Sequence, residues 1–180
     1  MKIDLLNCFL KDKIKEEFSL YFGIQNEQLI EKIANEWFNE SHDFDGRWDI
    51  IMARQKSDNK ILDLAAGCGT FLLFGLNQGY DVWGVEPETW KLEFFKKKVT
   101  DSGYSSEFLT HMISGKGEAL PFEDNSFDLI TSYQTLEHVE SVSQCLQEMM
   151  RVLRPNGTLY IKCPDYNSFY EPHYQLPFCL

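Results

Sequence analysis

A run of small residues after a short apolar segment is the part of the sequence best suited to chemistry. It lies within ILDLAAGCGTF (residues 61–71), where Asp63 is followed at alternate positions by Ala65, Gly67 and Gly69. Small side chains let the backbone turn sharply and approach a ligand closely. Turns and helix caps also use glycine, so the run predicts a nucleoside-cofactor loop and leaves an ordinary turn as the alternative.

A second acidic residue, Glu86, stands at the end of the next apolar segment, YDVWGV (residues 80–85). A carboxylate beside a cofactor loop can accept hydrogen bonds from both hydroxyls of a ribose. The alternative is a solvated acidic residue at the start of a helix, but the position of Glu86 favours ribose binding. Pro87 follows, where the first turn of a helix tolerates proline.

The spacing of the loop distinguishes between two kinds of adenosine cofactor. A dinucleotide loop of the form G-x-G-x-x-G uses its third glycine to pack strand and helix closely around a pyrophosphate. Counted from Gly67, that third position is Leu72. The spacing therefore disfavours an NAD-dependent oxidoreductase, which we keep as the third of three hypotheses.

Alternating apolar and amphipathic segments must position these residues. The patterns predict buried strands at residues 60–64, 80–85, within 108–114, 126–132 and 158–163, and helices over 70–76, 87–99 and 142–153. Such alternation is typical of an α/β protein with a three-layer, doubly wound, mostly parallel sheet. Ligands of these sheets bind beyond the carboxyl ends of the strands, where the predicted loop falls.

The chain divides into three segments of what we expect to be one compact domain. Residues 1–57 are predicted to form a helical N-terminal cover, with Asn26 as the N-cap of its second helix. Residues 58–165 form the cofactor-binding α/β core, and residues 166–180 an aromatic tail. The segment of residues 44–48 is expected to help cover the site.

Composition restricts the partners and the compartment. The formal net charge is −11, which disfavours nucleic acid, and the one basic run, residues 96–98, is expected on a solvated helix face. The five cysteines are scattered without metal-ligand spacing. No apolar run approaches the ~18 residues of a membrane span. We therefore expect a cytoplasmic protein without a membrane span, a disulfide framework or a metal.

The loop also resembles the first motif of the class I S-adenosylmethionine-dependent methyltransferases, which reads acidic-x-small-x-Gly-x-Gly. GKGEALPFEDNSFDLITS (residues 115–132) resembles the third motif and fourth strand of that family. TLEHV (135–139) and EMMRVLRPNGTLYI (148–161) resemble its later segments. The ordered series covers about residues 55–165. It is most similar to the small-molecule branch that includes the ubiquinone and menaquinone biosynthesis methyltransferases.

The resemblance implies a Rossmann-like methyltransferase fold that binds S-adenosylmethionine and releases S-adenosylhomocysteine, with no metal. The loop would hold the methionine part of the cofactor, Glu86 the ribose and residues 117–119 the adenine, while residues 133–134 would lie near the reaction centre. The expected cofactor-binding residues are Asp63, Ala65, Ala66, Gly67, Gly69, Glu86, Pro87, Gly117, Glu118, Ala119, Tyr133 and Gln134.

Two positions depart from the pattern of the family. Ala65 stands where glycine is usual, which is tolerated as long as the backbone there needs no positive φ. Lys116 stands where many relatives carry an acidic residue that contacts the adenine amino group. Either Glu118 substitutes in that contact or the contact is absent.

His138, with Glu137 beside it, is the candidate general base for an acceptor that must lose a proton. The alternative is that His138 caps or packs against the following helix. Methyl transfer needs little covalent help from the protein, because the sulfonium already makes the methyl group electrophilic and the enzyme only has to align the acceptor.

The first hypothesis is therefore a methyltransferase that acts on a small-molecule acceptor by in-line displacement. The second is a cofactor-binding but catalytically incomplete fragment or partner subunit. The fold of the family normally continues after the fifth strand, so we expect the C-terminal strands to be missing or abbreviated. The free edge of that strand would need a cover, which could be the aromatic tail, a second copy of the chain in a homodimer or a further C-terminal segment.

Overall fold

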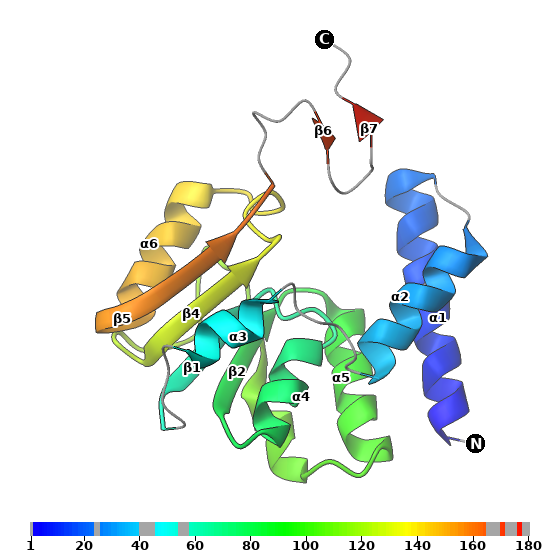
Figure 1. Cartoon of the computed structure of the whole chain (residues 1–180), viewed down its shortest axis with the longest axis horizontal. Helices are drawn as coiled ribbons and strands as arrows, with labels where there is room; N and C mark the ends of the chain where they lie inside the picture. The colour runs from blue at the N-terminus through cyan, green and yellow to red at the C-terminus, as the bar shows by residue number, and fades with distance from the viewer. Residues whose placement is uncertain are drawn as a thin grey trace.

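The computed structural model describes residues 2–23, 26–39, 46–53, 58–164, 170–171 and 176–177. An N-terminal helical hairpin stands beside an α/β core (Figure 1). The helices are α1 (Lys2–Phe22), α2 (Glu27–Asn39), α3 (Arg47–Met52), α4 (Thr70–Asn77), α5 (Thr89–Asp101), the 3₁₀-helix η2 (Ser106–His111) and α6 (Val142–Val152). The strands are β1 (Lys60–Leu64), β2 (Asp81–Glu86), β3 (Met112–Ser114), β4 (Phe127–Tyr133), β5 (Leu153–Lys162), β6 (Tyr170–Glu171) and β7 (Leu176–Pro177).

The main sheet has five strands in the order β3-β2-β1-β4-β5, and all of its pairings are parallel. The chain adds strands on one side of β1 and then crosses to the other side. The strand order therefore reverses at β1, and the loop after this strand opens into the crevice where such sheets bind ligands. The predicted doubly wound α/β fold is confirmed.

Two apolar layers cover the faces of the sheet. Along β1 the side chains alternate, so that Ile61 joins a cluster with α4 and α5 while Leu62 and Leu64 join a cluster with α6. Both faces are buried, as the continuous apolar runs of the strands predict. The result is a three-layer core whose strand ends are held rigidly on both sides.

A third apolar cluster attaches the N-terminal hairpin to this core. Leu6, Leu10 and Ile14 recur every fourth residue of α1 and are buried against α2 and against Phe94 of α5. The side chain of Asn26 accepts a hydrogen bond from the Leu29 N–H at 3.1 Å, which confirms its predicted role as the N-cap of α2. The hairpin is therefore packed against the α/β core.

Several expectations about local structure are wrong. Pro87 precedes the first turn of α5 instead of lying in it, because the helix begins at Thr89 after the N-cap Glu88. Strand β5 begins at Leu153, directly after α6, where it pairs with Phe127. In the basic run, Lys98 is only 2% exposed, and its ammonium donates to the carbonyl of Trp37 at 3.2 Å instead of facing solvent.

Parts of the predicted cover and tail lie outside the described residues. Within the predicted tail, only β6 and β7 are described, and they pair antiparallel. Residues 44 and 45 of the predicted covering segment also lie outside. Trp48 packs edge-on against Phe71, Phe74 and Tyr80, so it belongs to the core. Among the helices that the structure describes, none has the length and apolarity required to cross a membrane.

Candidate functional site

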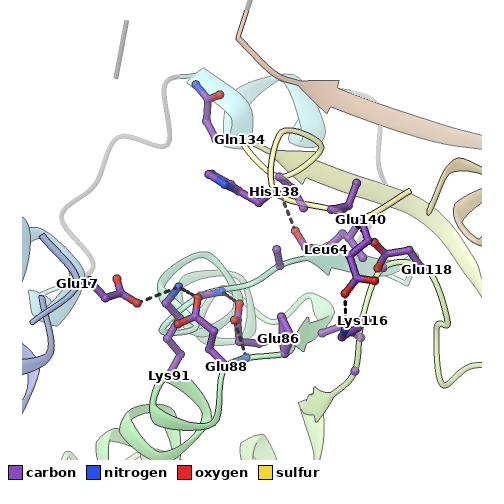
Figure 2. A pocket seen from close by; sticks show the side chains of 18 residues that line it. Glu17, Leu64, Glu86, Glu88, Lys91, Lys116, Glu118, Gln134, His138 and Glu140 are labelled. Carbon is purple, nitrogen blue, oxygen red and sulfur yellow. Dashed lines mark hydrogen bonds and ion pairs between the residues drawn. The ribbon is translucent and has the colours of Figure 1, made fainter. Parts of the chain in front are cut away.

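A cavity of about 680 Å³ opens at the carboxyl ends of β1, β2 and β4, and we call it the main cavity (Figure 2). Its walls come from the loop after β1, the start of α5, residues 115–118, residues 134–135 and 138–140, and one side chain of α1. A smaller hollow of about 340 Å³ adjoins the same loop and shares Ala65, Gly67 and Lys91 with the main cavity.

The two glycines of the loop after β1 are required for different structural reasons. Both have positive φ, 57° at Gly67 and 77° at Gly69, a conformation that side chains disfavour. A Cβ at Gly69 would lie 2.5 Å from the Phe95 ring, so this position must be small for α4 to pack against α5. A Cβ at Gly67 would meet nothing within 4 Å. Gly67 therefore leaves open space at the cavity wall.

Alanine at position 65, where glycine is usual in the family, would be harmless only if the backbone had no positive φ there. The structure does not meet this condition. The φ of Ala65 is 56°, in the left-handed region. A residue with a Cβ pays roughly 1–2 kcal/mol for this conformation. The loop keeps the bend nonetheless, since the N–H of Ala66 donates to the carbonyl of Val85 at 3.0 Å. The site therefore contains a strained alanine at its first turn.

Glu86 holds the loop against the end of β2. Its side chain is 2% exposed, and its two oxygens accept hydrogen bonds from the N–H of Gly67 at 2.8 Å and of Glu88 at 3.0 Å. Burial raises the pKa of Glu86, while the ammonium of Lys91 opposes that shift. Each carboxylate oxygen keeps a second lone pair with which it can accept from a ligand hydroxyl.

Asp63 faces the smaller hollow and not the main cavity, and it forms a buried ion pair. Nη1 of Arg47 lies 3.0 Å from Oδ1 of Asp63, and the two residues are 7% and 3% exposed. The guanidinium also stacks over the Phe71 ring at 3.9 Å. Burial raises the pKa of Asp63 to about 6 against the opposing effect of Arg47. Helix α3 thus brings a cation to the end of β1.

The predicted adenine segment lines the main cavity in part. A Cβ at Gly117 would lie 2.7 Å from Sγ of Cys145, so only glycine fits against α6. One oxygen of Glu118 accepts from the N–H groups of Glu140 at 2.7 Å and Ser141 at 3.3 Å, which stabilises the start of α6. Lys116 forms an ion pair with Glu140 at 2.8 Å. Ala119 lies outside the cavity lining and closes a turn.

The opposite wall carries Gln134, one of the two residues predicted near the reaction centre, and the candidate base His138. Figure 2 shows Gln134 and His138 across the cavity from Glu86 and Lys91. Oε1 of Gln134 is buried and has no hydrogen-bond partner among the described residues. His138 is exposed, and the N-cap of α6 is Ser141, so His138 neither packs in the core nor caps that helix. Glu137 lies outside the lining of both hollows.

The structure therefore brings most of the predicted cofactor residues to two adjoining hollows. The main cavity gathers Ala65, Gly67, Glu86, Pro87, Gly117, Glu118 and Gln134. The smaller hollow adds Asp63, Ala66 and Tyr133. Gly69 and Ala119 support the walls from outside.

Sequence reasoning missed five charged residues of the two hollows, which are Glu17, Arg47, Glu88, Lys91 and Glu140. Lys91 lines both, and its spacing of three residues from Glu88 is a helical signal that could have found it. Glu17 comes from α1 and lines the main cavity, and Arg47 comes from α3. Neither has a local signal, because each reaches the site from a segment outside the α/β core.

Comparisons with known proteins point to one family. A family model described as a methyltransferase domain matches residues 62–161. A demethylmenaquinone methyltransferase from Renibacterium salmoninarum is 34% identical over 102 residues, which are 57% of this chain and 40% of the relative. A ubiquinone/menaquinone biosynthesis C-methyltransferase UbiE from Desulfotalea psychrophila is 29% identical over 167 residues, which are 87% of this chain and 65% of the relative.

A solved structure gives the same result. A SAM-dependent methyltransferase from Methanosarcina mazei superposes with a TM-score of 0.55 and 25% identity, over 62% of this chain and 55% of that one. The chain spans 40% and 65% of the length of the two curated relatives. Because the family model covers more than half of the chain, the protein belongs to the methyltransferase-domain family, and the predicted resemblance to class I S-adenosylmethionine-dependent methyltransferases is confirmed.

Proposed function

We propose that the protein binds S-adenosylmethionine in the main cavity and the adjoining smaller hollow and transfers its methyl group to a small-molecule acceptor. The observation that carries this proposal is the contact between Glu86 and Gly67. A buried carboxylate and a glycine loop are held together at the end of β1, where the strand order reverses.

The residues present fit this cofactor. The main cavity, at about 680 Å³, falls within the ~300–1,000 Å³ that are usual for small-molecule sites. Gly67 leaves space where any other residue would place a side chain. Oε1 of Gln134 is a buried acceptor without a described partner, and the hydroxyl and amino groups of the cofactor are donors.

We assign the parts of the cofactor to the residues as follows. Glu86 accepts from the ribose hydroxyls, and residues 117–118 face the adenine. Arg47 and Asp63 flank the smaller hollow with a positive and a negative charge, which suits the carboxylate and the ammonium of an amino acid. Ala65 and Gly67 line both hollows and lie between these two ends.

The bound cofactor supplies an electrophilic methyl group, and the chain supplies alignment. Holding two reactants in line can contribute ~7–11 kcal/mol to the lowering of a barrier. His138 lines the main cavity and is exposed, so its imidazole can take a proton from an acceptor hydroxyl or acidic carbon. The names of the two curated relatives, which refer to ubiquinone and menaquinone, support an acceptor of the small-molecule class.

The test is calorimetric titration with S-adenosylmethionine and S-adenosylhomocysteine. We expect the wild type to bind both, and Glu86→Gln to weaken each at least about tenfold, because the amide cannot accept from two ribose hydroxyls and two N–H groups. Glu93→Gln is the matched control, since Glu93 lies on the exposed face of α5 and pairs only with Lys97 among the contacts described. Binding no tighter than millimolar, or unchanged binding in Glu86→Gln, would contradict the proposal.

Methyl transfer itself requires a second measurement. We expect radiolabelled methyl to appear on at least one member of a panel of small aromatic and hydroxylated acceptors. Tight cofactor binding without transfer to any acceptor would favour the second hypothesis, a cofactor-binding partner or fragment.

A further inference from the structure

Helix α1 lies outside the α/β core, but it places a carboxylate in the wall of the main cavity. Figure 2 shows Glu17 reaching from α1 toward Lys91. One oxygen of Glu17 accepts from Nε1 of Trp90 at 3.0 Å and lies 3.8 Å from Nζ of Lys91. The side chain of Glu17 is 23% exposed. The hairpin therefore contributes a fixed, half-buried charge to the cofactor site.

This part of the cavity has more negative than positive charge. Glu17 and Glu88 both pair with the ammonium of Lys91, and Glu86 lies within its electrostatic reach. Across the cavity, Lys116 pairs with Glu140, and Glu118 adds another carboxylate. The lining thus holds five glutamates against two lysines.

For two of these glutamates, Glu17 and Glu86, the surroundings disfavour the ionised form. Burial raises the pKa of Glu17 and of Glu86, while Lys91 opposes both shifts. These directions mean that the ionised carboxylates are held in an environment that favours their neutral form. A positively charged ligand in the cavity would relieve that cost.

We propose that Glu17 makes the N-terminal hairpin part of the cofactor site and biases this site toward the sulfonium form of the cofactor over the neutral thioether form. The inference rests on the proposed function. In the transfer step the bond between sulfur and the methyl carbon breaks, its electron pair stays on sulfur, and the new bond forms to the acceptor. The positive charge thereby leaves the sulfur, and the attraction to Glu17 is lost. Product release is favoured for the same reason.

The two forms of the cofactor make this bias measurable. S-adenosylmethionine and S-adenosylhomocysteine share the adenine, the ribose and the amino-acid end, so the ratio of their dissociation constants reports the response to the sulfonium. In Glu17→Gln the amide oxygen can still accept from Trp90, and only the charge is removed. We expect the preference for the sulfonium form to fall by about threefold to tenfold, the size expected for one charge at the wall of a partly solvated cavity.

Glu16→Gln is the matched control. Glu16 is the neighbouring residue of α1, is 65% exposed and pairs with Lys13 outside the cavity. Calorimetry should give the wild-type ratio for Glu16→Gln and a reduced ratio for Glu17→Gln. An unchanged ratio in Glu17→Gln, with cofactor binding intact, would overturn the role of Glu17 and leave the proposed function standing. A wild type that binds neither form would instead contradict the proposed function itself.

A second measurement covers the case in which Glu17→Gln unfolds. In the wild type, added potassium chloride should reduce the preference for the sulfonium form, because salt screens the charges of partly exposed residues. A preference that stays constant from low salt to about 0.5 M would overturn the inference.

Discussion

Ala65 holds a left-handed backbone at the first turn of the loop after β1, where a Cβ is unfavourable. We expect Ala65→Gly to raise the free energy of unfolding by about 0.5–1 kcal/mol, the relief of strain less the added entropy of glycine in the unfolded chain. Urea denaturation measures this change.

The neighbouring alanine provides the control for this substitution. Ala66 is buried, with no left-handed strain to relieve. Ala66→Gly should therefore lower the free energy of unfolding by roughly 1 kcal/mol, through lost packing and greater entropy of the unfolded chain. A loss of stability in Ala65→Gly comparable to that in Ala66→Gly would show that the strain at Ala65 is absent.

At the scale of elements, Lys98 ties the end of α2 to α5. Its ammonium donates to the carbonyl of Trp37, which also accepts from the hydroxyl of Thr70 at 3.3 Å. A cation at the C-terminal end of a helix is also favoured by the helix dipole. We expect Lys98→Met to lower the free energy of unfolding by about 1.5–3 kcal/mol, the usual size for a hydrogen bond to a charged group.

Hydrogen exchange of the amides in α2 would locate the loss of stability in Lys98→Met. Lys96→Met is the control, because Lys96 is exposed on the same helix and should change the stability by no more than ~0.5 kcal/mol. Equal effects of the two substitutions would mean that the contact with Trp37 contributes nothing.

The strands and helix starts that were predicted correctly are marked by residues close to them in the sequence. Strands β1, β2 and β4 are short apolar runs, and their faces are buried on both sides. Asn26 caps α2 as predicted, and Ser141 caps α6 in the same way, because a side chain three residues from an N–H is a purely local geometry. The start of β5 was missed, since pairing with β4 extends that strand into a segment rich in turn residues.

At the scale of the whole molecule, a cluster around Glu148 joins α6 to the segment before β4. The carboxylate accepts from Nε and Nη2 of Arg151, both at 2.7 Å, and from the N–H of Leu120 at 2.8 Å. Arg151 in turn donates to the carbonyls of Leu120 and Phe122. The hydrogen bond with Arg151 lowers the pKa of Glu148 below its ordinary value of 4.5.

This lowered pKa makes stability depend on pH in a defined direction. Glu148 contributes stability fully above pH 4.5, its unfolded value, and that contribution is lost as the pH falls through the lowered pKa of the folded state. We expect the free energy of unfolding of the wild type to exceed that of Glu148→Gln by about 1–2 kcal/mol at pH 7. Below pH 4.5 this difference should become progressively smaller. Denaturation curves at a series of pH values measure the difference.

Glu123→Gln controls for the general loss of a negative charge, because Glu123 is exposed in the same segment. Its stability should track that of the wild type across the whole pH range. A difference between wild type and Glu148→Gln that persists unchanged at low pH would contradict the linkage.

The charged residues contributed by the N-terminal segment could not be predicted from sequence. Glu17 and Trp90 are 73 residues apart, and Arg47 meets Thr131 across 84 residues. Such contacts depend on how α1 to α3 pack against the core. Neither the spacing of residues nor the composition of the chain predicts that packing. The glycine turn after β1 and the position of Glu86 at the end of β2 were predictable because strand ends and glycine positions are local features.

The contact of Trp90 with α1 has a practical consequence. The indole N–H of Trp90 is shared between Glu17 of the hairpin and Glu88, the N-cap of α5. An indole emits at longer wavelength when water replaces protein around it. A chain whose other three tryptophans are changed to phenylalanine would therefore carry a single indole, at the contact between α1 and α5. The emission wavelength of Trp90 would then report, without any added label, whether the hairpin is packed against the core or separated from it.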